Sequence, residues 1–143
     1  MASATLNNVL KVFGAKPTEQ EQSALAEEVM LMTLSRATAA DTNIKEVEVD
    51  MVRSVLEKHL GKNYSSADIR IAANSEMYEV APLQEYLASA SSKMRSTDKV
   101  QTIQALAEVI NVDGRVNAME IAFLNEVATA LALTPAQIMG LVE

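Results

Sequence analysis

Apolar residues recur at intervals of three and four along most of the chain, which is the spacing that gathers them on one face of an α-helix. The first such stretch covers residues 3–13 and is followed by Gly14, a residue type that commonly ends helices. Longer apolar stripes flank two polar turns, at residues 41–43 and 111–114. No stretch shows the strict alternation of a half-buried strand. We therefore predict an all-α fold, a bundle of seven to eight helices.

Capping patterns predict where several of these helices begin. Thr18 followed by Glu21, and Ser65 followed by Asp68, have the spacing of a capping box. In a capping box, two residues three positions apart satisfy each other's backbone N–H groups at a helix start. We expect helices to begin after Thr18 and after Ser65, the second of them running to about Val80.

One acidic pattern occurs twice in the chain. Asp-x-x-[Ile or Val]-x-x-x-Glu covers residues 41–48 and again residues 113–120, so the copies lie 72 residues apart. Apolar positions on both sides keep that offset. The pairs are Leu31 with Ile103, Leu34 with Leu106, Val52 with Leu124 and Val55 with Val127. Matching residues at a fixed offset indicate an internal repeat.

This repeat predicts how the domain is organised. We expect a single domain over residues 1–143, with repeat A at about residues 20–75 and repeat B at about residues 96–143. Each repeat is a helix-turn-helix unit, and the N-terminal helix 3–13 lies outside both. Because the apolar faces match, we expect the repeats to pack on each other about a pseudo-twofold axis, which would place the two acidic turns in related environments.

The composition agrees with a helical domain. The 143 residues are 49% hydrophobic but only 3% aromatic, so the core must be built from aliphatic side chains. Four Gly and three Pro leave few residues for the many tight turns of a sheet protein. The eight Met residues lie mostly on the predicted buried stripes, so we expect them mainly to fill the core.

The charge narrows the classes of partner. The formal net charge is −7, and no cluster of Lys and Arg offsets it, so we expect no binding to nucleic acid. Proteins and metal cations remain as partners, and the oligomeric state is left open. The chain has no Cys, no basic leader and no apolar run of the roughly 20 residues that a transmembrane helix needs. We expect a cytoplasmic protein, for which peripheral contact with a membrane stays open.

The acidic turns are candidate divalent-cation sites. An EF-hand loop offers oxygen ligands at alternate positions and a bidentate Glu at its end. Four residues of the second turn fall on such positions: Asn111, Asp113, Asn117 and Glu120. Val109 takes the place of the leading Asp, however. The first turn offers only two carboxylates, those of Asp41 and Glu48.

The same residues also have an interpretation that needs no ion. Gly114 can end a helix in the left-handed conformation, and Val116 can enter the core. Asn117 and Glu120 can form a capping box. The sequence therefore leaves open whether the acidic turns bind a cation or serve the backbone.

Little in the chain indicates catalysis. His59 is the only histidine, and it falls near the end of a predicted helix, where we expect a surface or capping role. No phosphate-binding or dinucleotide-binding motif and no nucleophile elbow is present. We expect no catalytic residue and no cofactor other than a divalent cation at the acidic turns. A hydrolase or transferase is the least favoured alternative.

The acidic turns carry a family resemblance. The segment from Val112 to Glu120, with a weaker copy from Ala40 to Glu48, resembles the tellurite-resistance TerB-like domain family. That family has a paired pattern of helix, Asp-Gly-x-[Ile or Val]-x-x-x-Glu and helix, and the likeness extends over roughly residues 20–140. The resemblance implies an all-helical bundle with a stress-response or membrane-associated accessory role. It also implies that acidic residues of the motif serve as metal ligands.

From the residues and the resemblance together, we expect a non-catalytic helical module that recruits partner proteins in a bacterial stress response. The alternative is a divalent metal-binding protein that uses the acidic turns.

Overall fold

The computed structural model describes residues 18–39, 49–74, 82–110 and 118–134, and all regular structure in these residues is helical. The helices are α2 (Glu19–Arg36), α3 (Val49–Leu60), α4 (Ser66–Ala73), α6 (Leu83–Ser91), α7 (Ser96–Ile110) and α8 (Ala118–Ala130). The predicted all-α class is confirmed. The expected helix 3–13 and the last helix of repeat B lie outside the described residues, so the total of seven to eight helices stays a prediction.

The capping boxes predicted at Thr18 and Ser65 are both present. The backbone N–H of Glu21 donates to Thr18 Oγ1 at 3.1 Å, and the N–H of Thr18 donates to Glu21 Oε1 at 2.8 Å. Ser65 and Asp68 form the same pair of bonds at the start of α4, at 3.1 and 3.0 Å. These reciprocal bonds satisfy N–H groups that have no partner inside the helix, which explains why α2 and α4 begin where the sequence predicts.

The predicted length of α4 was wrong. The helix ends at Ala73 rather than near Val80. At the next residue, Asn74, the backbone N–H and the side-chain Nδ2 both donate to the carbonyl oxygen of Arg70, at 3.1 and 3.0 Å. An Asn that bonds back to the backbone in this way competes with continuation of the helix.

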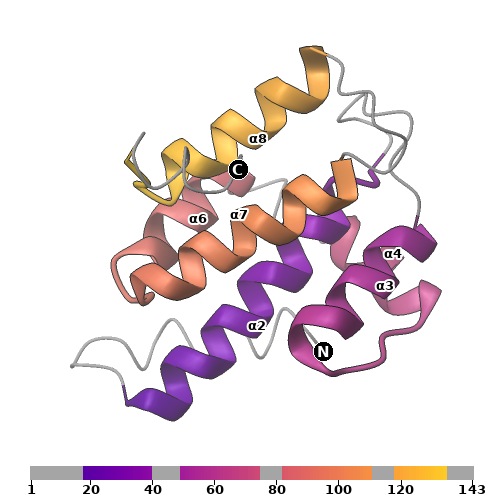
Figure 1. Cartoon of the computed structure of the whole chain (residues 1–143), viewed down its shortest axis with the longest axis horizontal. Coiled ribbons are helices and arrows are strands. Elements are labelled where there is room, and N and C mark those ends of the chain that lie inside the picture. The colour runs from indigo at the N-terminus through magenta and orange to yellow at the C-terminus, as the bar shows by residue number, and fades with distance from the viewer. Residues whose placement is uncertain (1–17, 40–48, 75–81, 111–117, 135–143) are drawn as a thin grey trace.

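Helix α2 lies at the centre of the fold and packs against α3, α4, α6 and α7 (Figure 1). Helix α8 packs on α6 and α7, and α3 packs on α4 and α7. The α2–α7 pair thus separates α3 and α4 on one side from α6 and α8 on the other. Where a helix contacts several neighbours, the side chains that face them are mostly apolar. Accordingly, Leu25, Val29, Met32 and Leu34 of α2 are all fully or almost fully buried.

The core is aliphatic, as the composition predicts. One cluster of buried residues runs through all six described helices, and Tyr86 and Phe123 are its only aromatic members among the described residues. Met30, Met32 and Met94 belong to this cluster, which confirms that these methionines fill the core.

The paired positions of the predicted repeat share their environment only in part. Leu34 and Leu106 are both 0% exposed, and Val55 and Val127 are both buried. Leu31 and Leu124, by contrast, are only partly buried, whereas their counterparts Ile103 and Val52 lie in the core. Two of the four pairs therefore share their environment and two do not, with one of each on α2 and α7 and one of each on α3 and α8.

No helix in the described part of the chain has both the length and the apolar character that crossing a membrane requires.

Candidate functional site

Most of the predicted cation ligands lie outside the described residues. This holds for Asn111, Asp113 and Asn117 of the second acidic turn and for Asp41 and Glu48 of the first. Glu120 is the only one of the six predicted ligands that the structure describes.

Glu120 lies in the first turn of α8 and is 0% exposed. Removing a carboxylate from water to this depth costs free energy unless hydrogen bonds, a cation or protonation of the group offset it. Its position therefore fits both interpretations of the acidic turn, since a helix-capping carboxylate and a metal-ligating carboxylate would each be held in this way. Elsewhere in the described residues, no group of three or more Asp, Glu, His or Cys side chains is placed to hold a metal ion.

His59 forms part of a charged cluster between α3 and α7. Its Nε2 pairs with Glu108 Oε2, and Lys58 donates to the other oxygen of the same carboxylate. The amide Nε2 of Gln101 donates to His59 Nδ1 at 3.3 Å. Because Nδ1 accepts this bond, the ring proton lies on Nε2 and is donated to Glu108. Both ring nitrogens are therefore engaged.

The expectation of a surface or capping role for His59 was wrong in part. The residue does lie in the last turn of α3, as predicted. Its side chain, however, is only 10% exposed and connects α3 to α7 through Glu108. Helical spacing places a residue on its own helix, but it does not identify a partner 49 residues away in the sequence.

The two groups that bond to Glu108 change its acidity. Burial of this carboxyl group favours the neutral form, but the hydrogen bonds from Lys58 and His59 and the positive charge of Lys58 favour the ionised form and outweigh burial. The pKa of Glu108 is consequently below its ordinary value of 4.5.

Glu28 is the opposite case. It lies on α2 with 7% of its surface exposed, and neither carboxylate oxygen has a hydrogen-bond partner. Burial without a partner disfavours the charged form and raises the pKa of Glu28 from 4.5 to about 7. Two other side chains of α2, Thr33 and Ser35, also have buried hydroxyl oxygens with no hydrogen-bond partner. The central helix thus carries unsatisfied polar groups in the core, which the spacing of residues in the sequence does not indicate.

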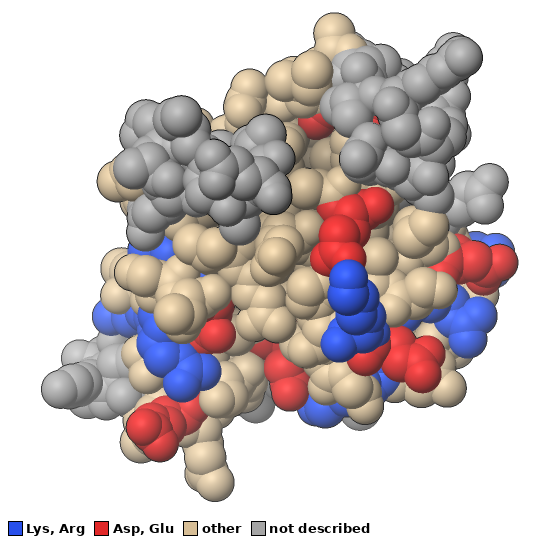
Figure 2. Space-filling model, viewed as in Figure 1, with Lys and Arg blue, Asp and Glu red and all other residues tan. Residues whose placement is uncertain are grey.

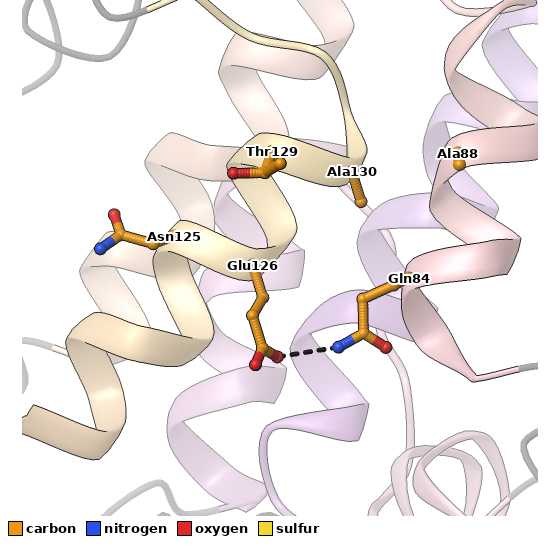
Figure 3. Close-up of a pocket in the computed structure, with 6 residues that line it drawn as sticks. All are labelled: Gln84, Ala88, Asn125, Glu126, Thr129 and Ala130. Atoms are coloured by element: carbon orange, nitrogen blue, oxygen red, sulfur yellow. Dashed lines mark hydrogen bonds between the residues drawn. The ribbon is translucent and has the colours of Figure 1, made fainter.

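A shallow, largely apolar groove of about 460 Å³ lies between α6 and α8. It is lined by Gln84, Ala88, Asn125, Glu126, Thr129 and Ala130. Figure 3 shows Ala88 and Ala130 on the facing sides of the two helices, with Gln84 and Glu126 turned toward each other. Gln84 Nε2 donates to Glu126 Oε2 at 2.9 Å, which joins the helices across the groove. We call this feature the α6–α8 groove.

The surroundings of the groove carry no cation from either helix. Neither α6 nor α8 contains Lys, Arg or His, and their exposed ionisable residues are Glu85 and Glu126. The Lys and Arg residues of the described chain lie instead on α2, α3, α4 and α7 and in the loops after α3 and α6. In the view of Figure 2, the visible blue side chains lie over the middle and lower parts of the molecule.

Comparison with known proteins supports the family resemblance. The sequence model of the family described as "Tellurite resistance protein TerB" matches residues 26–141. That range includes both acidic turns and all of α3, α4, α6, α7 and α8. No curated protein and no solved structure matches the chain.

The raised pKa of Glu28 predicts that folding stability falls as the pH rises. The unfolded chain releases the proton near pH 4.5 and the folded chain near pH 7, so the native state is penalised progressively between these values and by a constant amount above them. Glu28→Gln should raise the free energy of unfolding by up to about 3 kcal/mol at pH 8 and change it little at pH 4. Urea unfolding at both pH values measures this, and Glu57→Gln, at an exposed position on α3, is the control. Equal effects of Glu28→Gln at the two pH values would contradict the assignment.

The lowered pKa of Glu108 predicts the opposite dependence on pH. The stabilisation is present above the ordinary value of 4.5 and is lost as the pH falls through the lower folded value. Glu108→Gln should reduce the free energy of unfolding by about 1 to 2 kcal/mol at pH 7, because it removes charge-assisted hydrogen bonds to Lys58 and His59. The loss should shrink in acid, again measured against Glu57→Gln. A loss that stays constant down to pH 3 would show that packing, not charge, is responsible.

Proposed function

The chain belongs to the tellurite resistance TerB family, and from that premise we propose that it is a non-catalytic helical module that recruits partner proteins. Its place would be the cytoplasm of a bacterial cell, as an accessory component of a stress response such as that to tellurite. The observation that supports recruitment most directly is the α6–α8 groove. It is an apolar depression between two helices on a face that carries few charges. Apolar grooves between helices are a common mode of binding partner helices.

The state of His59 supports a non-catalytic role. A general base must have a ring nitrogen available to accept a proton from a reacting group. Both nitrogens of the only histidine in the chain are occupied, one by Glu108 and the other by Gln101. The cluster therefore acts as a connection between α3 and α7, and its contribution is structural.

We further propose that repeats A and B are related by a pseudo-twofold axis. Helix α2 packs on α3 as α7 packs on α8, and the two leading helices, α2 and α7, pack on each other. An axis passing through the α2–α7 contact would exchange one repeat with the other. The mutual burial of Leu34 and Leu106 supports this arrangement, because these positions are equivalent in the two repeats.

The second candidate function is binding of a divalent cation at the acidic turns. The observation that favours it is the complete burial of Glu120, the residue that would end the second ion-binding loop. Asp113, Asn111 and Asn117 would supply the remaining ligands of that turn, and Asp41 and Glu48 would be the carboxylates of the first. A bound cation would supply charge compensation for these groups and would fix the turn between α7 and α8.

The recruitment function predicts a stable partner. The chain used as bait in an extract of its own cell should retain a specific protein through washing, and a bait with the surface of α3 altered at Glu57 should retain the same protein. Recovery is measured by mass spectrometry against a bait-free control. Repeated failure to recover any protein, together with a large rise in melting temperature caused by a small molecule, would favour a ligand-binding or enzymatic role instead.

The cation function predicts binding heat that depends on the second turn. Calorimetric titration with Ca²⁺, Mg²⁺, Mn²⁺ and Zn²⁺ should give saturable heat for at least one ion, and Asp113→Ala should reduce the affinity at least about tenfold because it removes a charged ligand. Asp50→Ala, in the exposed first turn of α3, is the matched control. Equal heat from the wild type and Asp113→Ala, or no heat with any ion, would exclude this function.

A further inference from the structure

The α6–α8 groove has a shape and a charge that specify its occupant. We propose that it binds one amphipathic helix of a partner protein, and that this helix presents a stripe of small and medium apolar residues flanked by Lys or Arg. The inference rests on the proposed recruitment function and adds the site and the chemistry of the partner.

The side chains that line the groove allow close approach of a helix. Ala88 on α6 and Ala130 on α8 leave the space between the two helices open, as Figure 3 shows. The groove has a volume of about 460 Å³, which is enough for several aliphatic side chains, but it is shallow. A shallow groove between helices suits the ridge of side chains along another helix, which can pack between the ridges of α6 and α8.

Helix α8 extends the apolar surface beyond the groove. Ile121 is 47% exposed, which makes it one of only two large hydrophobic side chains that the described residues expose to this degree. It lies four and eight positions before Asn125 and Thr129, so the three residues share one face of α8. A partner helix seated in the groove could therefore continue along α8 and cover Ile121, which an isolated chain leaves in contact with water.

The charge at the rim identifies the flanking residues of the partner. Glu126 lines the groove, Glu85 lies in the first turn of the neighbouring helix, and neither α6 nor α8 supplies a cation to pair with them. Glu126 accepts a hydrogen bond from the neutral amide of Gln84, which positions the carboxylate without neutralising its charge. A partner helix with Lys or Arg beside its apolar stripe would complement these carboxylates, and a partner with Asp or Glu there would be repelled.

The same charges argue against a second copy of this chain as the occupant. Two copies related by a twofold axis would bring the same face of each together. Glu85 and Glu126 of both copies would then lie in one interface with no cation from α6 or α8, and each copy carries a net charge of −7. Like charges brought together in this way oppose association.

Selection from a library of displayed helix-forming peptides tests the proposal on the full chain. The library varies both the position of the apolar stripe and the charge beside it. We expect the recovered peptides to share an apolar stripe at helical spacing and Lys or Arg next to it. Recovery of peptides with acidic flanks, or of none, would overturn the proposal.

Variants of the full chain then locate the binding site of a recovered peptide. Ala88→Gln places a longer polar side chain in the groove and should weaken binding about tenfold, whereas Ala67→Gln, on an exposed position of α4, should not. Glu126→Lys should weaken binding of the basic peptide by a similar factor and strengthen binding of its acidic-flanked counterpart, whereas Glu57→Lys makes the same change in net charge on α3 and should do neither. Equal effects of each variant and its control would place the binding site elsewhere and overturn the proposal.

Two further measurements distinguish a failure of this proposal from a failure of the recruitment function on which it rests. If the cellular partner is retained equally by the wild type and by Ala88→Gln, the recruitment function stands and the groove is not its site. If no partner is retained by either, the recruitment function itself fails. Sedimentation of the wild type as a dimer and of Ala88→Gln as a monomer would identify a second copy as the occupant and overturn the proposal.

Discussion

The packing of α2 against α7 is the contact on which the rest of this structure depends. These helices supply Leu34 and Leu106, both without exposure to solvent, and every other described helix packs on at least one of the two. Since aromatic side chains are almost absent from the core, its cohesion comes from many small dispersion contacts between closely spaced aliphatic groups. Such a core tolerates little loss of volume, because neighbouring side chains cannot move far enough to refill a gap.

The central position of α2 has a cost in buried polar groups. The first turns of α2 expose polar side chains such as Glu19, Gln20 and Ser23 to solvent. Farther along the helix, where neighbouring helices enclose it, Glu28, Thr33 and Ser35 have side-chain oxygens inside the protein with no hydrogen-bond partner. Glu108 works in the other direction, because its carboxylate pairs with Lys58 and accepts a hydrogen bond from His59, and these bonds connect α3 to α7. The pH dependence of stability is therefore a balance between an unpaired carboxylate on α2 and a paired one on α7.

The features that the sequence predicted are those set by neighbouring residues. The capping boxes at Thr18 and Ser65 need only residues three positions apart, and the apolar stripes need only helical spacing. The features that were missed depend on tertiary contacts. Helical spacing places Glu28 beside the apolar stripe of α2 and Glu27 away from it, but it identifies no partner for either. In the structure Glu27 pairs with Lys62 at the surface, and Glu28 lies in the core without a hydrogen-bond partner. The site was predicted less well than the fold, because the groove is formed by residues 42 positions apart, such as Gln84 and Glu126, that carry no motif.

The unequal distribution of charge connects the fold to its proposed use. Several cations of the described chain form ion pairs with carboxylates. Lys58 pairs with Glu108, and Lys62 pairs with Glu27. Helices α6 and α8, by contrast, carry exposed carboxylates and no Lys or Arg of their own. Rim charges of this kind contribute more to the choice of partner and to the rate of association than to affinity. Affinity would come instead from covering the alanine-lined groove and Ile121. The negative charge of Glu126 would favour an apolar helix flanked by Lys or Arg over one flanked by Asp or Glu. This division of roles suits a module that must select one partner among many amphipathic helices in a cell.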